Sequence, residues 1–213
     1  MLRKGIVSLH LNRKLLWVFC VSLGAFLTQP GSVSAGAPTE QIQSAVERVT
    51  TILKDPKLQA GAKRKELKDA VYSKFDFSEM ARRSLGSHWQ RRSPEEQREF
   101  VRLFTELVKN AYMTNLDGYQ GEKVVIGGER QDKEFAEVDT KIITKKGEEF
   151  AVNYKLRQAG NEWKIYDVVI ENISIVNNYR SQFNRVIAQS SFDDLFRKMK
   201  DKQFEAAGKK RNT

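Results

Sequence analysis

Apolar residues recur every three or four positions in the first half of the chain, a spacing that predicts amphipathic helices. We expect these helices at residues 40–54, 61–75, 78–85 and 93–117. Ser78 and Gly86 are predicted to cap the two ends of the third helix. Ser93, Pro94 and Glu96 predict a strong start for the fourth, because they form a capping box with proline at the first helical position.

Between residues 123 and 171 the hydrophobic period changes to two, which is typical of strands with one face in water. The expected strands span residues 123–126, 134–144, 149–158 and 163–171. Gly127-Gly128 is interpreted as the first turn, and the later turns contain Gly147 and Gly160. The short connections predict a mainly antiparallel meander of four strands, covered on one face by several helices. The predicted fold class is therefore α+β.

The last strand continues almost directly into another helix. Residues 163–171 are β-branched and aromatic, and Val176, Tyr179 and Phe183 then follow at helical spacing. Ser191 opens a final short helix. The strand and the helix after it carry more apolar surface than a charged protein of this size needs. We predict that the sheet and the helices enclose an apolar pocket that holds an apolar ligand.

The first 37 residues have the features of a secretory signal peptide. Arg3 and Lys4 belong to a basic start, residues 15–27 are mostly apolar, and Ala35 and Ala37 each end a small-residue cleavage pattern. The apolar run is shorter than the ~20 residues of a membrane span. We therefore expect a signal peptide at 1–37, a single domain at 38–205 and a basic flexible tail at 206–213.

Charge and cysteine content narrow the possible partners. Cys20, the only cysteine, lies in the leader, so the rest of the chain can form no disulfide and no thiolate metal site. The leader carries four of the basic residues and no acidic one, so the net charge falls from +10 to +6 in the mature chain (10 − 4 = 6). For an exported protein, this positive charge favours anionic lipid headgroups or an acidic partner. The aromatic residues follow core-type stripes and are not interleaved with the lysines, which argues against nucleic-acid binding.

The sequence shows no arrangement typical of an enzyme. His10 lies in the leader, so His88 is the single histidine of the expected domain and no histidine-rich metal site can form. Asp167 is predicted to be buried in the last strand, where its carboxylate needs a partner such as Arg180, Arg185 or a backbone N–H. We expect no catalytic residue, no metal and no cofactor.

Two groups of residues carry a resemblance to a known family. The first group is Phe75-Asp76-Phe77, Met80-Ala81, Leu85-Gly86 and Trp89. The second group is Tyr166-Asp167-Val168, Ser174 and the run from Asn178 to Phe183. They resemble the MlaC family of periplasmic phospholipid-binding proteins, also called the toluene-tolerance family. Asn172 departs from the family pattern, which tends to have a small residue there.

The resemblance implies a carrier of glycerophospholipid with no chemical step. Such a protein holds the acyl tails in a deep apolar pocket and leaves the headgroup near the mouth. It shuttles lipid between an outer-membrane lipoprotein–porin complex and an inner-membrane ABC transporter complex with an MCE-domain protein. This transport maintains the lipid asymmetry of the outer membrane. The protein is expected to be a periplasmic monomer.

Strand alternation and helix spacing indicate which side chains would line the pocket. The expected lining residues are Leu103, Leu107, Val108, Tyr112, Val138, Ile142, Val152, Tyr154, Leu156, Tyr166, Val168, Ile170, Tyr179 and Phe183. For Arg180 we expect a structural salt bridge rather than a headgroup contact.

Two alternatives remain open at this point. A lipid-free adaptor that bridges envelope complexes through its basic surfaces would have a filled core. An exported α+β enzyme would use Asp167 and His88, and it would carry no lipid.

Overall fold

The computed structural model describes residues 37–117, 122–201 and 203–204, and only the backbone of residues 113–117. The expected signal peptide up to residue 36, the helix end at Gly118 and the basic tail lie outside these ranges. The helices are α1 (Ala37–Lys54), α2 (Ala60–Tyr72), α3 (Phe77–Leu85), the 3-10 helix η1 (Gly86–Arg91), α4 (Pro94–Asp117), α5 (Ile175–Gln189) and α6 (Phe192–Lys200). Within the described ranges, none of the helices is both long and apolar enough to cross a bilayer.

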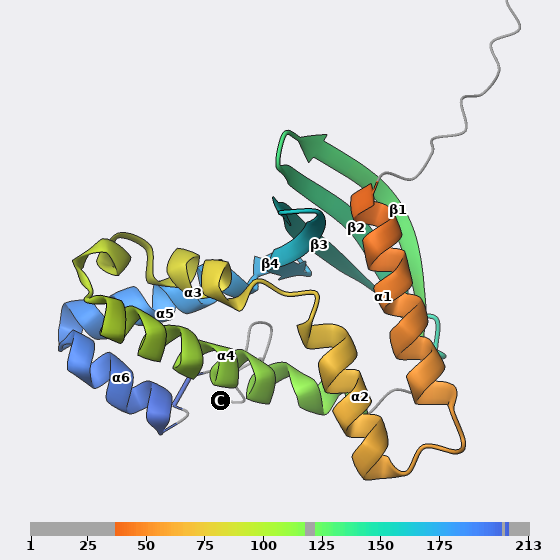
Figure 1. Ribbon diagram of the computed structural model, residues 1–213, viewed down its shortest axis with the longest axis horizontal. Coiled ribbons are helices and arrows are strands. Elements are labelled where there is room, and N and C mark those ends of the chain that lie inside the picture. The colour runs from red at the N-terminus through yellow and green to blue at the C-terminus, as the bar shows by residue number, and fades with distance from the viewer. Residues whose placement is uncertain (1–36, 118–121, 202, 205–213) are drawn as a thin grey trace, which may run out of the picture. The chain divides into compact units, whose positions relative to one another are not determined.

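The strands form one antiparallel sheet in chain order, as Figure 1 shows. They are β1 (Lys123–Asp132), β2 (Phe135–Ile143), β3 (Glu149–Ala159), β4 (Glu162–Ile170) and the two-residue β5 (Ile173–Ser174). The predicted α+β class and the antiparallel meander are confirmed, with β5 added at the edge beside β4.

The prediction of a turn at Gly127-Gly128 is wrong. β1 continues through both glycines, with a bulge between Ile126 and Glu129. A Cβ on Gly127 would lie only 3.3 Å from the carbonyl oxygen of Asp139 in β2. Glycine is needed here because the two backbones approach closely at the bulge. The turn follows later, at Lys133, which has a φ of 53°.

Helix α3 is capped by Asp76 and not by the predicted Ser78. The Asp76 carboxylate accepts a hydrogen bond from the backbone N–H of Glu79 at 2.9 Å. The same carboxylate accepts two hydrogen bonds from the Arg157 guanidinium of β3, at 2.9 and 2.6 Å. The backbone of Asp76 also donates to the carbonyl of Ile165 in β4 at 2.8 Å. The start of α3 is therefore fixed to two strands of the sheet.

Other helix starts follow the sequence signals. In α4, Ser93 and Glu96 form the predicted capping box, with backbone-to-side-chain distances of 2.8 and 3.2 Å. In α6, the Ser191 hydroxyl accepts the N–H of Asp194 at 3.1 Å. These caps are local, so residue types alone were enough to predict them.

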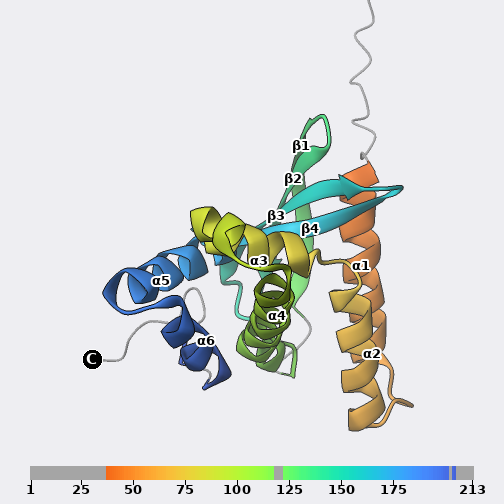
Figure 2. The same cartoon turned by 60° about the vertical axis from the view of Figure 1, so that its left-hand side comes forward.

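The helices pack in two groups within this part of the chain. Helix α1 packs against α2 and against β1, β2 and β4, whereas α3, α4, α5 and α6 pack on one another, as Figures 1 and 2 show. Thr39 fixes α1 to the sheet by donating its N–H and its hydroxyl to Glu129 of β1, at 2.9 and 2.5 Å.

Replacing Asp76 tests the link between α3 and the sheet. Asp76→Ala removes the helix cap and leaves Arg157 without its carboxylate, so we expect the free energy of unfolding to fall by about 2–3 kcal/mol. Asp76→Asn retains an oxygen for the Glu79 N–H and should lose less. Urea denaturation measures both, with the exposed Asp132→Ala as a control expected to change little. Equal losses for alanine and asparagine would show that the cap contributes nothing.

Candidate functional site

One face of the sheet carries a continuous set of partly exposed apolar side chains. We call these residues the apolar floor: Ile126, Ile142, Phe150, Tyr154 and Ile170. The pairing of Ile142 with Phe150, and of Val152 with Ile170, places them on one face of the sheet. Each keeps some accessible surface, and Phe150 is 41% exposed.

The floor is closed at one end and open at the other. Val138 and Leu156 lie on the same face and are fully buried. Helix α1 covers this end, because Thr39 binds Glu129, which pairs directly with Val138. Exposure rises away from α1 toward the β2–β3 hairpin, where Ile142 is half-buried and Phe150 exposed. An apolar ligand therefore has access to the floor from the hairpin end.

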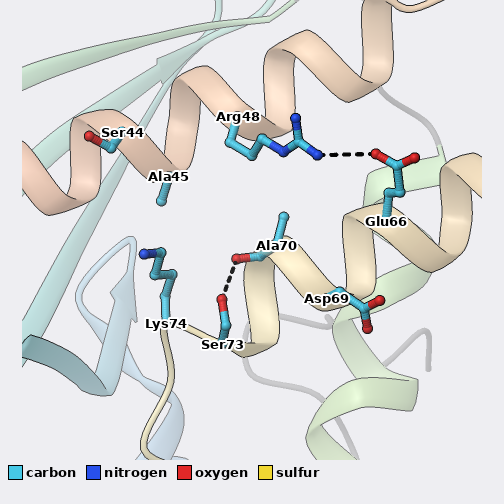
Figure 3. A pocket seen from close by; sticks show the side chains of 8 residues that line it. All are labelled: Ser44, Ala45, Arg48, Glu66, Asp69, Ala70, Ser73 and Lys74. Atoms are coloured by element: carbon cyan, nitrogen blue, oxygen red, sulfur yellow. Dashed lines mark hydrogen bonds and ion pairs between the residues drawn. The ribbon is translucent and has the colours of Figure 1, made fainter.

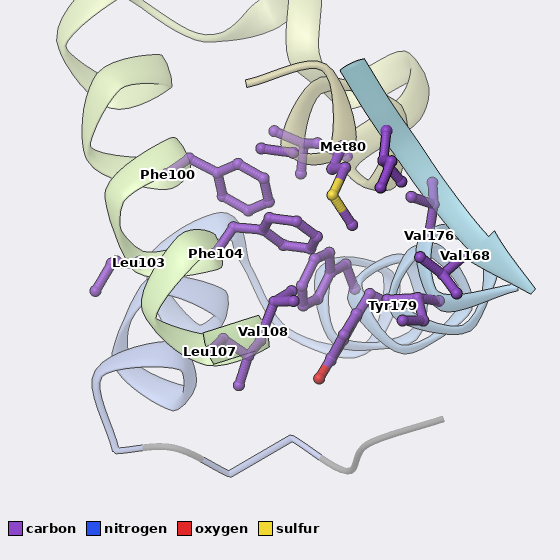
Figure 4. Packing of buried hydrophobic residues seen from close by; sticks show 14 of the residues in the cluster. Met80, Phe100, Leu103, Phe104, Leu107, Val108, Val168, Val176 and Tyr179 are labelled. Carbon is purple, nitrogen blue, oxygen red and sulfur yellow. The ribbon is translucent and has the colours of Figure 1, made fainter. Parts of the chain in front are cut away.

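Helices α4 and α5 supply a second apolar surface, the helical wall, formed by Phe104, Leu107 and Val108 of α4 and Tyr179 and Phe183 of α5. The Phe104 ring lies 5.7 Å from the Tyr179 ring and 6.3 Å from the Phe183 ring, edge to face in both cases. Figure 4 shows the Tyr179 ring extending beside Phe104, with its hydroxyl on the side of Leu107 and Val108. The wall belongs to the same hydrophobic cluster as four of the floor residues, Ile126, Ile142, Tyr154 and Ile170, whereas the exposed Phe150 lies outside it.

Tyr154 stands out among the floor residues. Burial raises the pKa of its phenol above the ordinary value. The side chain nevertheless keeps accessible surface, and no hydrogen bond between described residues involves its hydroxyl. The floor is therefore incompletely covered at Tyr154.

The structure brings together all the predicted lining residues except Tyr166 in one hydrophobic cluster. Nine of them are closed to solvent, with exposures of 6% or less: Leu103, Leu107, Val108, Val138, Val152, Leu156, Val168, Tyr179 and Phe183. The other four are half-buried: Tyr112, Ile142, Tyr154 and Ile170. The half-buried residues are the ones that a ligand can reach without displacing core packing.

Tyr166 lies apart because a bulge interrupts the alternation of β4 between Ile165 and Asp167, opposite the step from Lys155 to Leu156. Its ring packs 5.9 Å from the ring of Phe135 and lies 4.1 Å from the Arg83 guanidinium. Phe135 belongs to the alternate set of β2 residues, on the face opposite Val138. The sequence prediction missed Ile126 and Phe150 as floor residues. The supposed turn at Gly127 hid Ile126.

Asp167 and His88, the residues that the enzyme alternative would use, do not form a catalytic pair. The Asp167 carboxylate accepts the Ser174 hydroxyl at 2.6 Å and the Val176 N–H at 3.0 Å, so a backbone N–H is its partner, as one of the predicted options had it. The Arg180 Nε donates to the carbonyl of Arg83 at 2.8 Å rather than to the expected carboxylate. No hydrogen bond or ion pair joins His88 to Asp167 in the described ranges. Nor do these ranges contain a cluster of three or more residues able to hold a metal.

A separate hollow of about 460 Å³ lies between α1 and α2, shown in Figure 3. Six of its eight lining residues have polar or charged side chains, among them Ser44, Asp69 and Lys74. The Arg48 guanidinium and the Glu66 carboxylate face each other across it at 3.2 Å. This hollow is unsuited to acyl tails and is not part of the apolar floor.

Comparisons with known proteins agree with the geometry. The sequence profile of the MlaC protein family matches residues 43–201. The chain is 24% identical over 200 residues to the intermembrane phospholipid transport system binding protein MlaC of Haemophilus influenzae, covering 88% of this chain and 92% of that protein. It is 26% identical over 102 residues to the toluene tolerance protein ttg2D of Pseudomonas putida, covering 47% of each.

A solved structure is similar as well. The phospholipid-binding protein from Ralstonia solanacearum, in complex with a phospholipid, matches with a TM-score of 0.70 and 26% identity. The match covers 79% of this chain and 97% of that one. The shared architecture therefore extends over nearly the whole neighbouring protein.

Glu79 of α3 is the carboxylate with the largest lowering of its pKa, and it predicts a pH dependence of stability. Burial alone would raise the pKa of its carboxyl, but hydrogen bonds from Arg82 and Arg83 outweigh burial and lower it to about 2. The folded pKa thus lies below the unfolded value near 4.5. The stabilisation is complete above about pH 4.5 and is lost as the pH falls toward 2.

We expect the free energy of unfolding to drop by about 2–3 kcal/mol across this window because of Glu79 alone. Denaturation curves recorded between pH 2 and 7 measure the drop. Glu79→Gln should flatten this part of the profile, whereas the exposed control Glu134→Gln should leave it unchanged. An unaltered profile for Glu79→Gln would contradict the lowered pKa.

Proposed function

Because the chain belongs to the MlaC family, we propose that it is a phospholipid carrier of the bacterial envelope. The observation that supports this best is the apolar floor, which is closed under α1 at Val138 and Leu156 and ends at the exposed Phe150. A protein that only needed a stable core would gain by covering these side chains. A carrier needs these side chains uncovered, because they contact the acyl tails of the bound lipid. In a membrane, the tails of neighbouring lipids make those contacts.

The energetics of the cargo support enclosure of the tails rather than a surface groove. Two acyl tails contain on the order of 30 methylenes, and each costs about 0.8 kcal/mol when it is exposed to water. The sum is roughly 24 kcal/mol, which headgroup hydrogen bonds of about 1 kcal/mol each could not supply. Tail burial should therefore dominate affinity, and the preference among headgroups should be loose. The half-buried residues Tyr112, Ile142, Tyr154 and Ile170 are the proposed first contacts of the tails, with the helical wall behind them.

The cost of exposing the acyl tails to water also limits how the lipid can be released. Loss of the lipid into water is too costly to be spontaneous, so release requires docking to a protein that opens the site or receives the tails directly. We propose that the protein works in the periplasm, exported by the leader at residues 1–37. Its partners there would be an inner-membrane ABC transporter complex with an MCE-domain protein and an outer-membrane lipoprotein–porin complex.

Native mass spectrometry of the protein, purified from cells without detergent, tests the carrier proposal. We expect a stoichiometric adduct with the mass of a phospholipid, and organic extraction should recover that lipid and show its number of tails. A lipid-free mass, together with failure to take up lipid from phosphatidylethanolamine–phosphatidylglycerol vesicles, would refute the proposal. It would favour the adaptor that bridges envelope complexes without cargo.

A matched pair of tryptophan substitutions tests whether the floor holds the tails. Ile142→Trp fills space on the floor at a half-buried position that can accept a larger side chain. Val125→Trp places the same ring on the opposite face, because Val125 pairs with Lys141 and is 45% exposed. We expect the first variant to retain several-fold less lipid after purification and the second to match the wild type, since only the first competes with the tails for space. Equal lipid content in the two variants would exclude Ile142 from the site.

A further inference from the structure

The Tyr179 hydroxyl is buried without a hydrogen-bond partner among the described residues. The side chain is fully closed to solvent, and its oxygen is one of four buried side-chain atoms in the described ranges that lack a partner. The ring stacks 5.7 Å from Phe183 and meets the Phe104 ring edge to face. Burial, and secondarily the nearby Tyr112 phenol, raises the pKa of Tyr179, so the group is a neutral donor at physiological pH.

An unpaired buried hydroxyl lowers stability and therefore needs an explanation. Phenylalanine at the same position would keep the ring contacts with Phe104 and Phe183 and remove the unpaired atom. The hydroxyl points to the side of Leu107 and Val108, within the helical wall that we assign to the tails, as Figure 4 shows. Because Tyr179 is closed to solvent in the lipid-free protein, a cargo molecule can supply the acceptor only by displacing the side chains packed around it.

The surroundings favour a neutral acceptor over an anionic one. A phosphate or a free carboxylate buried at this point would need a cation beside it. The adjacent arginine, Arg180, is directed elsewhere, because its Nε donates to the Arg83 carbonyl of α3. In a glycerolipid the neutral acceptor next to the tails is the carbonyl oxygen of the acyl ester.

We propose that the Tyr179 hydroxyl donates a hydrogen bond to an acyl ester carbonyl of the carried lipid and so selects ester-linked glycerolipids. The inference rests on the proposed carrier function. The proposed contact is a single polar interaction inside an otherwise apolar site. It fixes the position of the acyl ester relative to Tyr179. Lipids with ether-linked chains lack this carbonyl and offer the hydroxyl only the ether oxygen, which lies elsewhere along the chain, so they bind less well at equal chain length.

The test uses the full chain, stripped of lipid, and two kinds of vesicle. One kind contains diacyl phosphatidylethanolamine and the other the dialkyl ether form with the same chain length and headgroup. Lipid bound per protein is measured by extraction and mass spectrometry, with both lipids in competition. We expect the wild type to prefer the ester lipid about three- to tenfold and Tyr179→Phe to lose this preference while still binding lipid.

A second readout separates a lipid contact from a structural role. If the hydroxyl serves the cargo, Tyr179→Phe should raise the thermal midpoint of the lipid-free protein by about 2–4 °C, because an unsatisfied buried group is removed. The variant would then be more stable and less selective at once. Tyr166→Phe is the matched control, since it deletes a tyrosine hydroxyl on the opposite face of the sheet and should leave the ester preference unchanged.

Each outcome decides the question. An ester preference that persists in Tyr179→Phe, or is absent from the wild type, would overturn the inference while leaving the carrier function intact. A lower thermal midpoint in the variant would show that the hydroxyl has a partner within the protein and would also overturn it. If the wild type takes up neither lipid, the carrier proposal itself fails, and the ester contact fails with it.

Discussion

The direction of α5, which carries part of the helical wall, depends on one buried carboxylate within β4. Asp167 is 5% exposed and accepts the Ser174 hydroxyl and the Val176 N–H. A buried carboxylate requires such donors, and the first turn of a helix offers free N–H groups with a favourable dipole. The carboxylate of β4 thus receives its donors from the start of α5, and a free N–H group of the first turn receives an acceptor. The turn between them, Glu171-Asn172, holds left-handed φ values of 48° and 64°, which asparagine tolerates better than most residues. Helix α5 therefore leaves the sheet in a fixed direction.

A second constraint locks that direction in place and explains why the two sequence groups that resemble the MlaC family occur together. Arg180 of α5 reaches across to the carbonyl of Arg83, at the C-terminal end of α3. It passes Gly86, where a Cβ would lie 3.7 Å from the Arg180 Nε and where φ is 58°. The Leu85-Gly86 pair of one group thus receives the arginine of the other. Because Asp76 binds α3 to β3 and Asp167 binds α5 to β4, the pair of helices α3 and α5 has two independent attachments to the sheet.

The sequence allowed prediction of those features whose signals are local. The capping box at Ser93 and the alternation of β2 and β3 needed only neighbouring residues, and both were confirmed. The cap of α3 was missed because Asp76 is held by Arg157, 81 positions away. The bulge at Gly127-Gly128 was mistaken for a turn, because a glycine pair suits either and only the approach of Asp139 decides. Tyr166 was assigned to the lining because a bulge shifts every later side chain by one position, and alternation cannot reveal a bulge.

The candidate site is where the chain departs from what stability alone would select. Covering Phe150 and Ile173, each 41% exposed, and replacing the unpaired Tyr179 hydroxyl by hydrogen would both stabilise the lipid-free protein. Phe150 and Ile173 pair with Ile142 and Ile170 of the apolar floor. Neither their exposure nor the unpaired hydroxyl is explained by the caps and ion pairs that hold the elements together. A carrier has to bind its cargo reversibly. Its lipid-free state must therefore be stable enough to remain folded, yet less stable than the lipid-bound state. In the proposed carrier, uncovered apolar surface and one unpaired donor would meet both conditions, because bound lipid would remove each deficit.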